Sequence, residues 1–176
     1  MIREGETLPE ATFVVMEKLG PEIKSTRDIF AGRRVALFGL PGAYTPVCHK
    51  EHLPGIVALH DALQGHGIDT VACTAVNDVF VLSRWAREHG AKGKVLMLAD
   101  GNADFATKSG LAVDLTQFGL GIRSNRYAML VADGKVTMLN VESVLSKHDR
   151  SSAATLCARM SETAPHAESA GAESAA

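Results

Sequence analysis

The sequence predicts an α/β sandwich with a mixed central sheet, and two observations support this prediction. Short apolar segments alternate with longer amphipathic ones, which is the pattern of parallel strands joined by helices. Near the C-terminus, Asp133-Gly134 separates two further apolar segments, and Asp-Gly is a strong signal for a two-residue β-hairpin. We therefore expect parallel strands in the middle of the sheet and an antiparallel hairpin at one side.

In the first half of the chain we expect three strands and two helical segments, at residues 11–16 (strand), 25–30 (turn or helix), 34–39 (strand), 46–63 (helix) and 70–76 (strand). Gly20-Pro21 ends the first strand. Pro54 kinks the long helix because proline lacks a backbone donor, and Gly65 and Gly67 end it. The last of these strands is apolar on both faces, as in the centre of a parallel sheet.

In the second half we expect helices and strands at residues 79–89 (helix), 95–99 (strand), 102–109 (helix), 126–131 and 135–141 (hairpin) and 151–160 (helix). Asn77 and Asp78 cap the first of these helices. This order of elements predicts a thioredoxin-like fold, with a mixed sheet flanked by helices, over residues 1–160. Residues 161–176 consist mainly of Ala, Ser, Glu and Gly, and we expect a disordered tail there.

Composition excludes several functional classes. At 176 residues and 46% hydrophobic content, the chain suits one domain with its own core. A net charge of −2 offers no basic surface for nucleic acid. No apolar run reaches the roughly 20 residues of a membrane span, and the N-terminus lacks the apolar core of a signal peptide. We therefore expect a cytoplasmic protein, in which three scattered cysteines are catalytic, redox-active or buried.

Cys48 is the strongest candidate for a reactive residue. Thr45 is a good helix N-cap, and Pro46 occupies the first helical position, where proline is favoured. This spacing puts Cys48 in the first turn, among free backbone N–H groups at the positive end of the helix dipole. Such surroundings favour the thiolate, which is the nucleophilic form of cysteine.

The residues around Cys48 also carry a family resemblance. Pro-Gly-Ala-Tyr-Thr-Pro-Val-Cys at residues 41–48, followed by His-Leu-Pro-Gly at residues 52–55, resembles the active-site segment of the peroxiredoxins, specifically the type II (peroxiredoxin-five-like) subgroup. Further similar segments follow in the same order, at residues 76–81, 85–86, 98–101, 119–121, 123–128 and 139–142. The resemblance extends over about residues 2–160.

This resemblance implies a thiol peroxidase that needs no metal, haem or flavin and forms a homodimer. Cys48 corresponds to the peroxidatic cysteine, which attacks a hydroperoxide and becomes a sulfenic acid. Thr45 corresponds to the residue that orients the peroxide, and Pro41 to the one that shields the site from water. Arg126 corresponds to the active-site arginine, whose positive fork stabilises thiolate charge and polarises the O–O bond. Arg123 is either an auxiliary cation, an interface residue or a solvated side chain.

The resemblance leaves the second half of the cycle open. Cys73 falls where plant-like type II members carry a second cysteine, so it is either a possible resolving residue or a buried, inert one. Cys157 falls in the last helix, outside the loop that carries the resolving cysteine in related proteins. We therefore expect an external thiol to reduce Cys48, with glutathione and glutaredoxin as first choice and thioredoxin as second.

A cysteine in this position could also serve functions other than peroxide reduction. A thiol–disulfide oxidoreductase needs Cys-x-x-Cys, but position 51 is Glu51. A cysteine hydrolase needs an assigned histidine base, which the Thr-x-x-Cys setting does not supply. His49 and His52 beside Cys48 are too few for a zinc site, so His52 is expected to pack locally or make a structural hydrogen bond. A peroxide-sensing or holdase protein that uses Cys48 as a switch remains the alternative.

Overall fold

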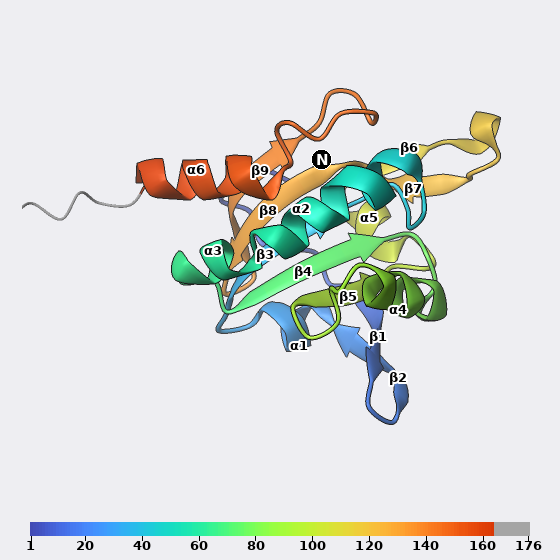
Figure 1. The fold of residues 1–176 in the computed structure, drawn as a ribbon, viewed down its shortest axis with the longest axis horizontal. Helices are drawn as coiled ribbons and strands as arrows, with labels where there is room; N and C mark the ends of the chain where they lie inside the picture. The colour runs from blue at the N-terminus through green and yellow to red at the C-terminus, as the bar shows by residue number, and fades with distance from the viewer. Residues whose placement is uncertain (164–176) are drawn as a thin grey trace, which may run out of the picture.

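A seven-stranded mixed sheet forms the centre of the structure, a computed structural model that describes residues 1–163 (Figure 1). Its strands are β1 (Thr12–Glu17), β2 (Gly20–Ser25), β3 (Arg34–Gly39), β4 (Thr70–Ala75), β5 (Val95–Ala99), β8 (Tyr127–Ala132) and β9 (Lys135–Val141). They are arranged in the order β2-β1-β5-β4-β3-β8-β9. The strands β3, β4 and β5 run parallel, and the remaining neighbours pair antiparallel.

The middle of the sheet and the C-terminal hairpin confirm the predicted pattern. β3 and β5 have the bounds expected from the sequence; β8 pairs along all of β3, and β4 pairs with residues 35–39 of it. Asp133 and Gly134 have φ of 49° and 74°, so both central residues of the β8–β9 turn are left-handed, as a type I′ hairpin requires. The continuous apolar sequence of β3 and β4 follows from their burial on both faces.

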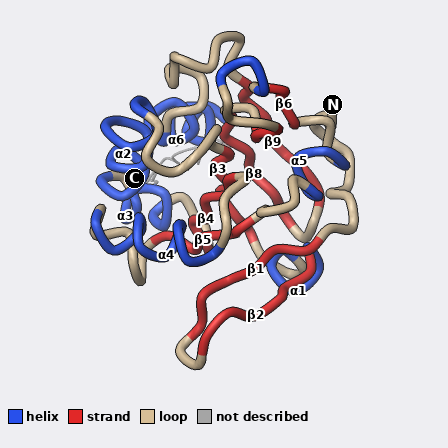
Figure 2. The backbone as a smooth tube through the Cα atoms, turned by 90° about the vertical axis from the view of Figure 1, so that its right-hand side faces the viewer, coloured by secondary structure: helices blue, strands red, loops and turns tan. Residues whose placement is uncertain are grey.

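Helices cover both faces of the sheet, which confirms the thioredoxin-like class (Figure 2). One face carries α2 (Leu53–Ala58), α3 (His60–Gly65), α4 (Val79–Glu88) and α6 (Ala153–Thr163); the other carries α1 (Thr26–Phe30) and α5 (Asp104–Lys108). Two buried clusters, one on each face, form the core. Asp78 caps α4 as predicted, because its carboxylate accepts the N–H groups of Phe80 and Val81 at 2.9 and 3.0 Å.

Three strands were not expected from the sequence. β1 ends at Glu17 and the chain turns back at residues 18–19, so Gly20-Pro21 begins β2, which pairs along the whole of β1. β2 is exposed and contains Pro21, as an edge strand tolerates, so its sequence lacks an apolar pattern. β6 (Ala112–Asp114) and β7 (Ile122–Ser124) form a separate pair of three residues each.

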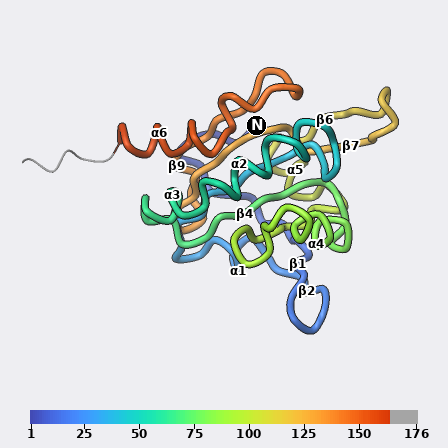
Figure 3. Tube along the Cα trace, viewed as in Figure 1, coloured from blue at the N-terminus to red at the C-terminus, as the bar shows by residue number. Residues whose placement is uncertain are grey.

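The helical segment that begins at Cys48 is divided into three pieces, whereas the sequence predicted one helix with a single kink at Pro54 (Figure 3). It consists of a π-helical turn (Cys48–His52), then α2, then α3 after a break at Leu59. Because Pro54 has no N–H, the carbonyl of Lys50 lacks its usual donor four residues on. The N–H of Leu53 donates instead to the Cys48 carbonyl, five residues back. Such π-turns often occur at functional sites.

The C-terminal helix α6 runs to Thr163, three residues beyond its expected end at residue 160. Residues 164–176, which contain most of the expected tail, lie outside the described residues. None of the helices in residues 1–163 has the length and hydropathy of a membrane-spanning helix.

Candidate active site

Cys48 lies where the chain leaves β3 and enters the π-helical turn, and its side chain is 0% exposed. The loop before it is fixed from two sides. Asn77, just before α4, accepts the N–H of Ala43 through Oδ1 at 2.9 Å. Arg123, on β7, donates from Nη1 to the Pro41 carbonyl at 3.4 Å. The loop is thereby held against segments that are distant in the sequence.

Arg123 has a positioning role in this arrangement. Its Nε donates to the Leu120 carbonyl at 2.8 Å while Nη1 reaches Pro41. A Cβ atom on Gly42 would lie 2.5 Å from the Arg123 guanidinium, so glycine at this position makes room for the contact. Pro41 itself is buried, as its expected shielding role requires.

Thr45 does not cap the helix with its side chain, which corrects the sequence expectation. Its hydroxyl donates to the Gly42 carbonyl at 2.8 Å, so it tightens the loop rather than accepting a helical N–H. The Thr45 carbonyl accepts the N–H of His49 at 2.8 Å and so begins the helical pattern through its backbone. The π-helical turn has no side-chain N-cap hydrogen bond.

Arg126, immediately before β8, is 2% exposed, and two hydrogen bonds hold its side chain. Its Nε donates to the Leu145 carbonyl at 3.0 Å, and its Nη1 bonds His52 Nδ1 at 3.0 Å. His52 Nε2 lies 2.9 Å from the Ser151 carbonyl, which only accepts. His52 Nε2 therefore carries the proton, and Nδ1 is free to accept from Arg126.

The electrostatics of His52 agree with this neutral tautomer. Burial lowers the pKa of His52 to about 3, the Ser151 carbonyl opposes that shift, and the charges of Arg126 and His148 add to it. A neutral His52 accepts a hydrogen bond from Arg126 without repelling it. The sequence predicted that His52 packs locally or makes a structural hydrogen bond, and the structure shows hydrogen bonds to Ser151 and to Arg126, the candidate active-site arginine. The only sequence signal was the four-residue spacing from Cys48, which puts both on one helical face.

Cys73 lies in the middle of β4, between Phe38 of β3 and Met97 of β5, and is 0% exposed. Burial strongly raises the pKa of its thiol; the charge of Cys48 raises it further and that of Arg126 lowers it. The fold therefore brings Cys48, Cys73 and Arg126 into one neighbourhood. Cys157 lies on α6, where burial raises its thiol pKa, and all three cysteines are free.

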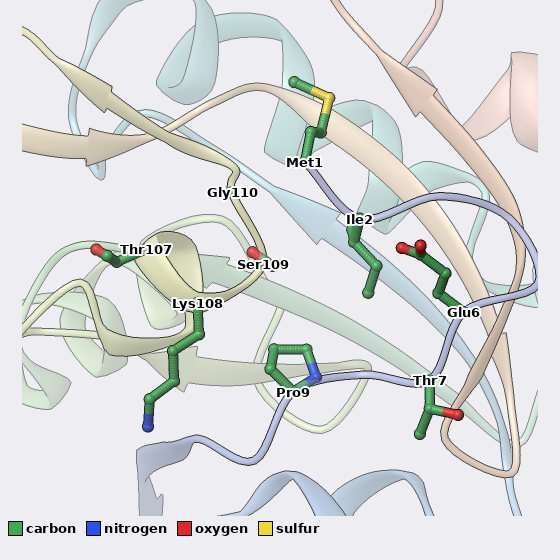
Figure 4. A pocket seen from close by; sticks show the side chains of 9 residues that line it. All are labelled: Met1, Ile2, Glu6, Thr7, Pro9, Thr107, Lys108, Ser109 and Gly110. Atoms are coloured by element: carbon green, nitrogen blue, oxygen red, sulfur yellow. The ribbon is translucent and has the colours of Figure 1, made fainter.

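Two surface hollows lie outside this neighbourhood. One is beside the N-terminus, where Met1, Ile2 and Pro9 face Ser109 and Gly110 (Figure 4). The other is a larger groove between α3 and α4. Neither is lined by Pro41, Thr45, Cys48 or Arg126, so neither extends the candidate site.

Comparison with known proteins defines the class. The Redoxin family model matches residues 3–157. Peroxiredoxin-2E, chloroplastic, of Arabidopsis thaliana is 40% identical over 145 residues, which cover 80% of this chain but 62% of that protein, less than two thirds of its length. Peroxiredoxin-2B of the same species is 38% identical over 143 residues, covering 81% of this chain and 88% of that protein.

The structure of reduced Prx3 from Vibrio vulnificus in complex with H2O2 is also similar. It has a TM-score of 0.86 and 43% identity, over 91% of this chain and 99% of that chain. The fold and the family match together define a thioredoxin-like protein of the Redoxin family. Within that family, the chain belongs to the type II peroxiredoxins.

Proposed function

We propose that the protein is a thiol peroxidase in which Cys48 is the peroxidatic cysteine. The observation that carries this proposal is the neighbourhood of Cys48: a cysteine at the start of a helical segment, near a buried arginine that neutral His52 holds in place. The family supports the same assignment. The substrates are hydrogen peroxide and small alkyl hydroperoxides.

In the oxidative step, the Cys48 thiolate attacks the terminal oxygen of the hydroperoxide. An S–O bond forms while the O–O bond breaks, and the leaving oxygen takes a proton and departs as water or an alcohol. Sulfur loses two electrons and becomes a sulfenic acid. Arg126 stabilises the negative charge that moves toward the leaving oxygen, since a fixed guanidinium needs no reorganisation during the reaction.

Thr45 and Pro41 have supporting roles in the proposal. Because the Thr45 hydroxyl already donates to the Gly42 carbonyl, its lone pairs are oriented to accept a hydrogen bond from the bound peroxide. Pro41 is buried and presents no N–H, so it keeps water from the thiolate. A dry site strengthens the electrostatic effect of Arg126.

We assign the reduction of the sulfenic acid to an external thiol. A thiol attacks the sulfenic sulfur, water leaves, and a second thiol reduces the mixed disulfide. Glutathione with glutaredoxin is the first choice and thioredoxin the second. Burial of Cys73 in the central sheet supports an inert role for it, because a disulfide with Cys48 requires both backbones to adapt. Residues 143–150 contain no cysteine that takes its place.

A homodimer completes the proposal. Large apolar side chains are exposed on segments that border the Cys48 loop: Tyr44 (46%), Phe80 (66%), Phe118 (68%), Leu120 (36%), Ile122 (44%) and Val144 (49%). We propose that these exposed apolar side chains form the dimer interface, because large apolar surface left open to water favours a protein contact. The cytoplasm, as the compartment in which the protein acts, stays a prediction from the sequence.

Hydroperoxide consumption by the purified protein tests the proposal. Parallel assays contain glutathione with glutaredoxin, or thioredoxin with its reductase, and compare the wild type with Cys48→Ser. We expect turnover with the wild type and none with the variant. Turnover that persists without Cys48 contradicts the assignment. A wild type that is oxidised once but not turned over by either reductant favours the peroxide-sensing or holdase alternative.

A further inference from the structure

A second histidine, His49, links the turn that carries Cys48 to helix α4. Its Nδ1 lies 3.1 Å from Trp85 Nε1 and 3.0 Å from His89 Nε2. The Tyr44 ring stacks on the His49 imidazole at 5.5 Å between centroids and 28° between planes. We call these four residues the His49 cluster. It joins the loop before Cys48, the π-helical turn and α4, and the peroxidase proposal does not use it.

The hydrogen bonds of the cluster fix the proton on His49. An indole N–H only donates, so His49 Nδ1 accepts from Trp85 and carries no proton. His89 Nε2 lies beside the same lone pair of His49 Nδ1, so it must also donate an N–H to it. His49 is therefore neutral here, with its proton on Nε2. Protonation of Nδ1 would set an N–H against two donors and break both hydrogen bonds.

The cluster also holds a strained backbone. Tyr44 has φ of +61°, a left-handed conformation that is uncommon for a residue with a large side chain. Such conformations persist where the surroundings hold them, and stacking on His49 is one restraint on Tyr44. Trp85 is 0% exposed, so an unpaired Nε1 would remain buried without a partner. Losing the His49 acceptor therefore weakens both sides of the Cys48 turn.

We propose that His49 is a proton-sensitive positioning residue: in its neutral form it keeps the Cys48 turn closed, and on protonation it releases that turn. The inference deepens the proposed function, on which it rests. Cys48 is fully buried, so a reductant must gain access by opening its surroundings. Acidification then favours the open, reducible form over the closed form in which peroxide reacts.

Charged and titratable groups approach His49 from both neighbouring segments. On α4, Glu88 is paired with Arg84 at 2.9 Å, and His89 follows it. Burial lowers the pKa of His89, a protonated His49 would lower it further, and Glu88 opposes the shift, so His89 also favours the neutral form. From the loop, the Tyr44 hydroxyl faces Glu88, and burial and this carboxylate raise its pKa. The positive charge of Arg84 offsets the negative charge of Glu88, the acid beside His49 and His89.

Fluorescence can report the hydrogen bonding of the His49 cluster, because Trp85 is the single tryptophan of the chain and the only source of indole emission. The emission of the reduced protein is recorded from pH 8 to pH 5, without peroxide or reductant. We expect the wild type to lose intensity and shift to longer wavelength on acidification, as the indole N–H loses its acceptor. Because no turnover is needed, this result is independent of the peroxidase assay.

Two variants separate protonation from a general structural effect. In His49→Asn the amide oxygen stands near the position of Nδ1 and accepts from Trp85 but does not titrate, so the transition should disappear. In His49→Leu the acceptor is absent, so emission should be shifted at every pH. Amide hydrogen exchange of the peptide spanning residues 44–52 should be about tenfold faster in His49→Leu and unchanged in His49→Asn. His66→Asn, outside the cluster, should behave as the wild type.

Three results would overturn the proposal. Wild-type emission that stays constant from pH 8 to pH 5 removes the proton sensitivity. A transition in His49→Asn equal to that of the wild type assigns the titration to another group. Loss of helical circular dichroism in the wild type over the same range assigns the change to global unfolding.

Discussion

Cys48 and Cys73 are both completely buried, yet their regions differ in what holds the backbone. Cys73 lies in the central strand β4, with hydrogen-bonded strands on both sides. Cys48 lies at the end of a loop, in the π-helical turn whose His52 binds the Arg126 guanidinium. Exposing Cys73 requires breaking the sheet, whereas exposing Cys48 requires opening one turn. Burial and the neighbouring Arg126 charge are shared by both cysteines, so we expect the strength of the local backbone to separate the proposed reactive cysteine from the inert one.

Replacing Cys48 should have the largest effect on activity. A serine hydroxyl is far less nucleophilic than a thiolate and cannot form the sulfenic acid, so Cys48→Ser should lower peroxide turnover by at least about a thousandfold. Its thermal unfolding should remain close to that of the wild type. Steady-state kinetics with hydrogen peroxide measures the effect. Residual activity above about a tenth of the wild type would mean that the two cysteine regions are not distinguished as we describe.

Replacing Arg126 tests the cation in the Cys48 region. Lysine keeps the charge but loses the planar fork that binds both Leu145 and His52, so Arg126→Lys should lower kcat/KM by about a hundredfold. The matched control is Arg123→Lys, whose side chain contacts only loop carbonyls; it should cost less than about tenfold. Equal losses in the two variants would show that Arg126 acts through the fold rather than on the reaction.

The pH dependence of the unfolding free energy tests whether His52, which supports Arg126 beside the Cys48 turn, is buried and neutral. Because burial depresses the pKa of His52 to about 3, only the unfolded state binds a proton between that value and the ordinary imidazole range near pH 6.5. Stability should therefore fall as the pH decreases through this window, by up to about 1.4 kcal/mol per pH unit from this one group. In His52→Asn this contribution should be absent.

Urea denaturation of both proteins between pH 7 and pH 4 measures the difference. Identical slopes of unfolding free energy against pH in the wild type and His52→Asn would contradict the neutral, buried histidine.

Replacing Cys73 should have the smallest effect on activity. Cys73→Ala removes one buried sulfur atom, so we expect a loss of about 1 kcal/mol in stability and a change of less than about twofold in peroxide turnover. The same turnover assay with glutathione and glutaredoxin checks it, alongside an unfolding curve. A loss of turnover in a variant that remains folded would bring Cys73 into the reductive half of the cycle.

Local patterns in the sequence were sufficient for the central strands, the Asp133-Gly134 hairpin and the Asp78 cap, because each depends on residues close together in the chain. They failed for β2, where an exposed edge strand needs no apolar alternation. They also failed for the Thr45 side chain, whose hydroxyl donates to the Gly42 carbonyl of the loop instead of capping the helix.

Most of the candidate site depends on contacts between distant segments. Arg126 and His52 are 74 positions apart, and His49 and Trp85 are 36 apart, so no spacing rule relates them. The family resemblance identified Cys48 and Arg126 as candidates, but it gave no partner for either histidine. The π-helical turn was also missed, since the missing donor of Pro54 predicts a defect without specifying its form.

The most direct test of the account is to locate the oxidised sulfur. The reduced protein receives one equivalent of hydrogen peroxide together with dimedone, which traps sulfenic acids, and peptide mass spectrometry identifies the modified residue. We predict an adduct on Cys48 and none on Cys73 or Cys157. An adduct on either of those residues while Cys48 remains unmodified would contradict the assignment of Cys48 as the cysteine that reacts with peroxide.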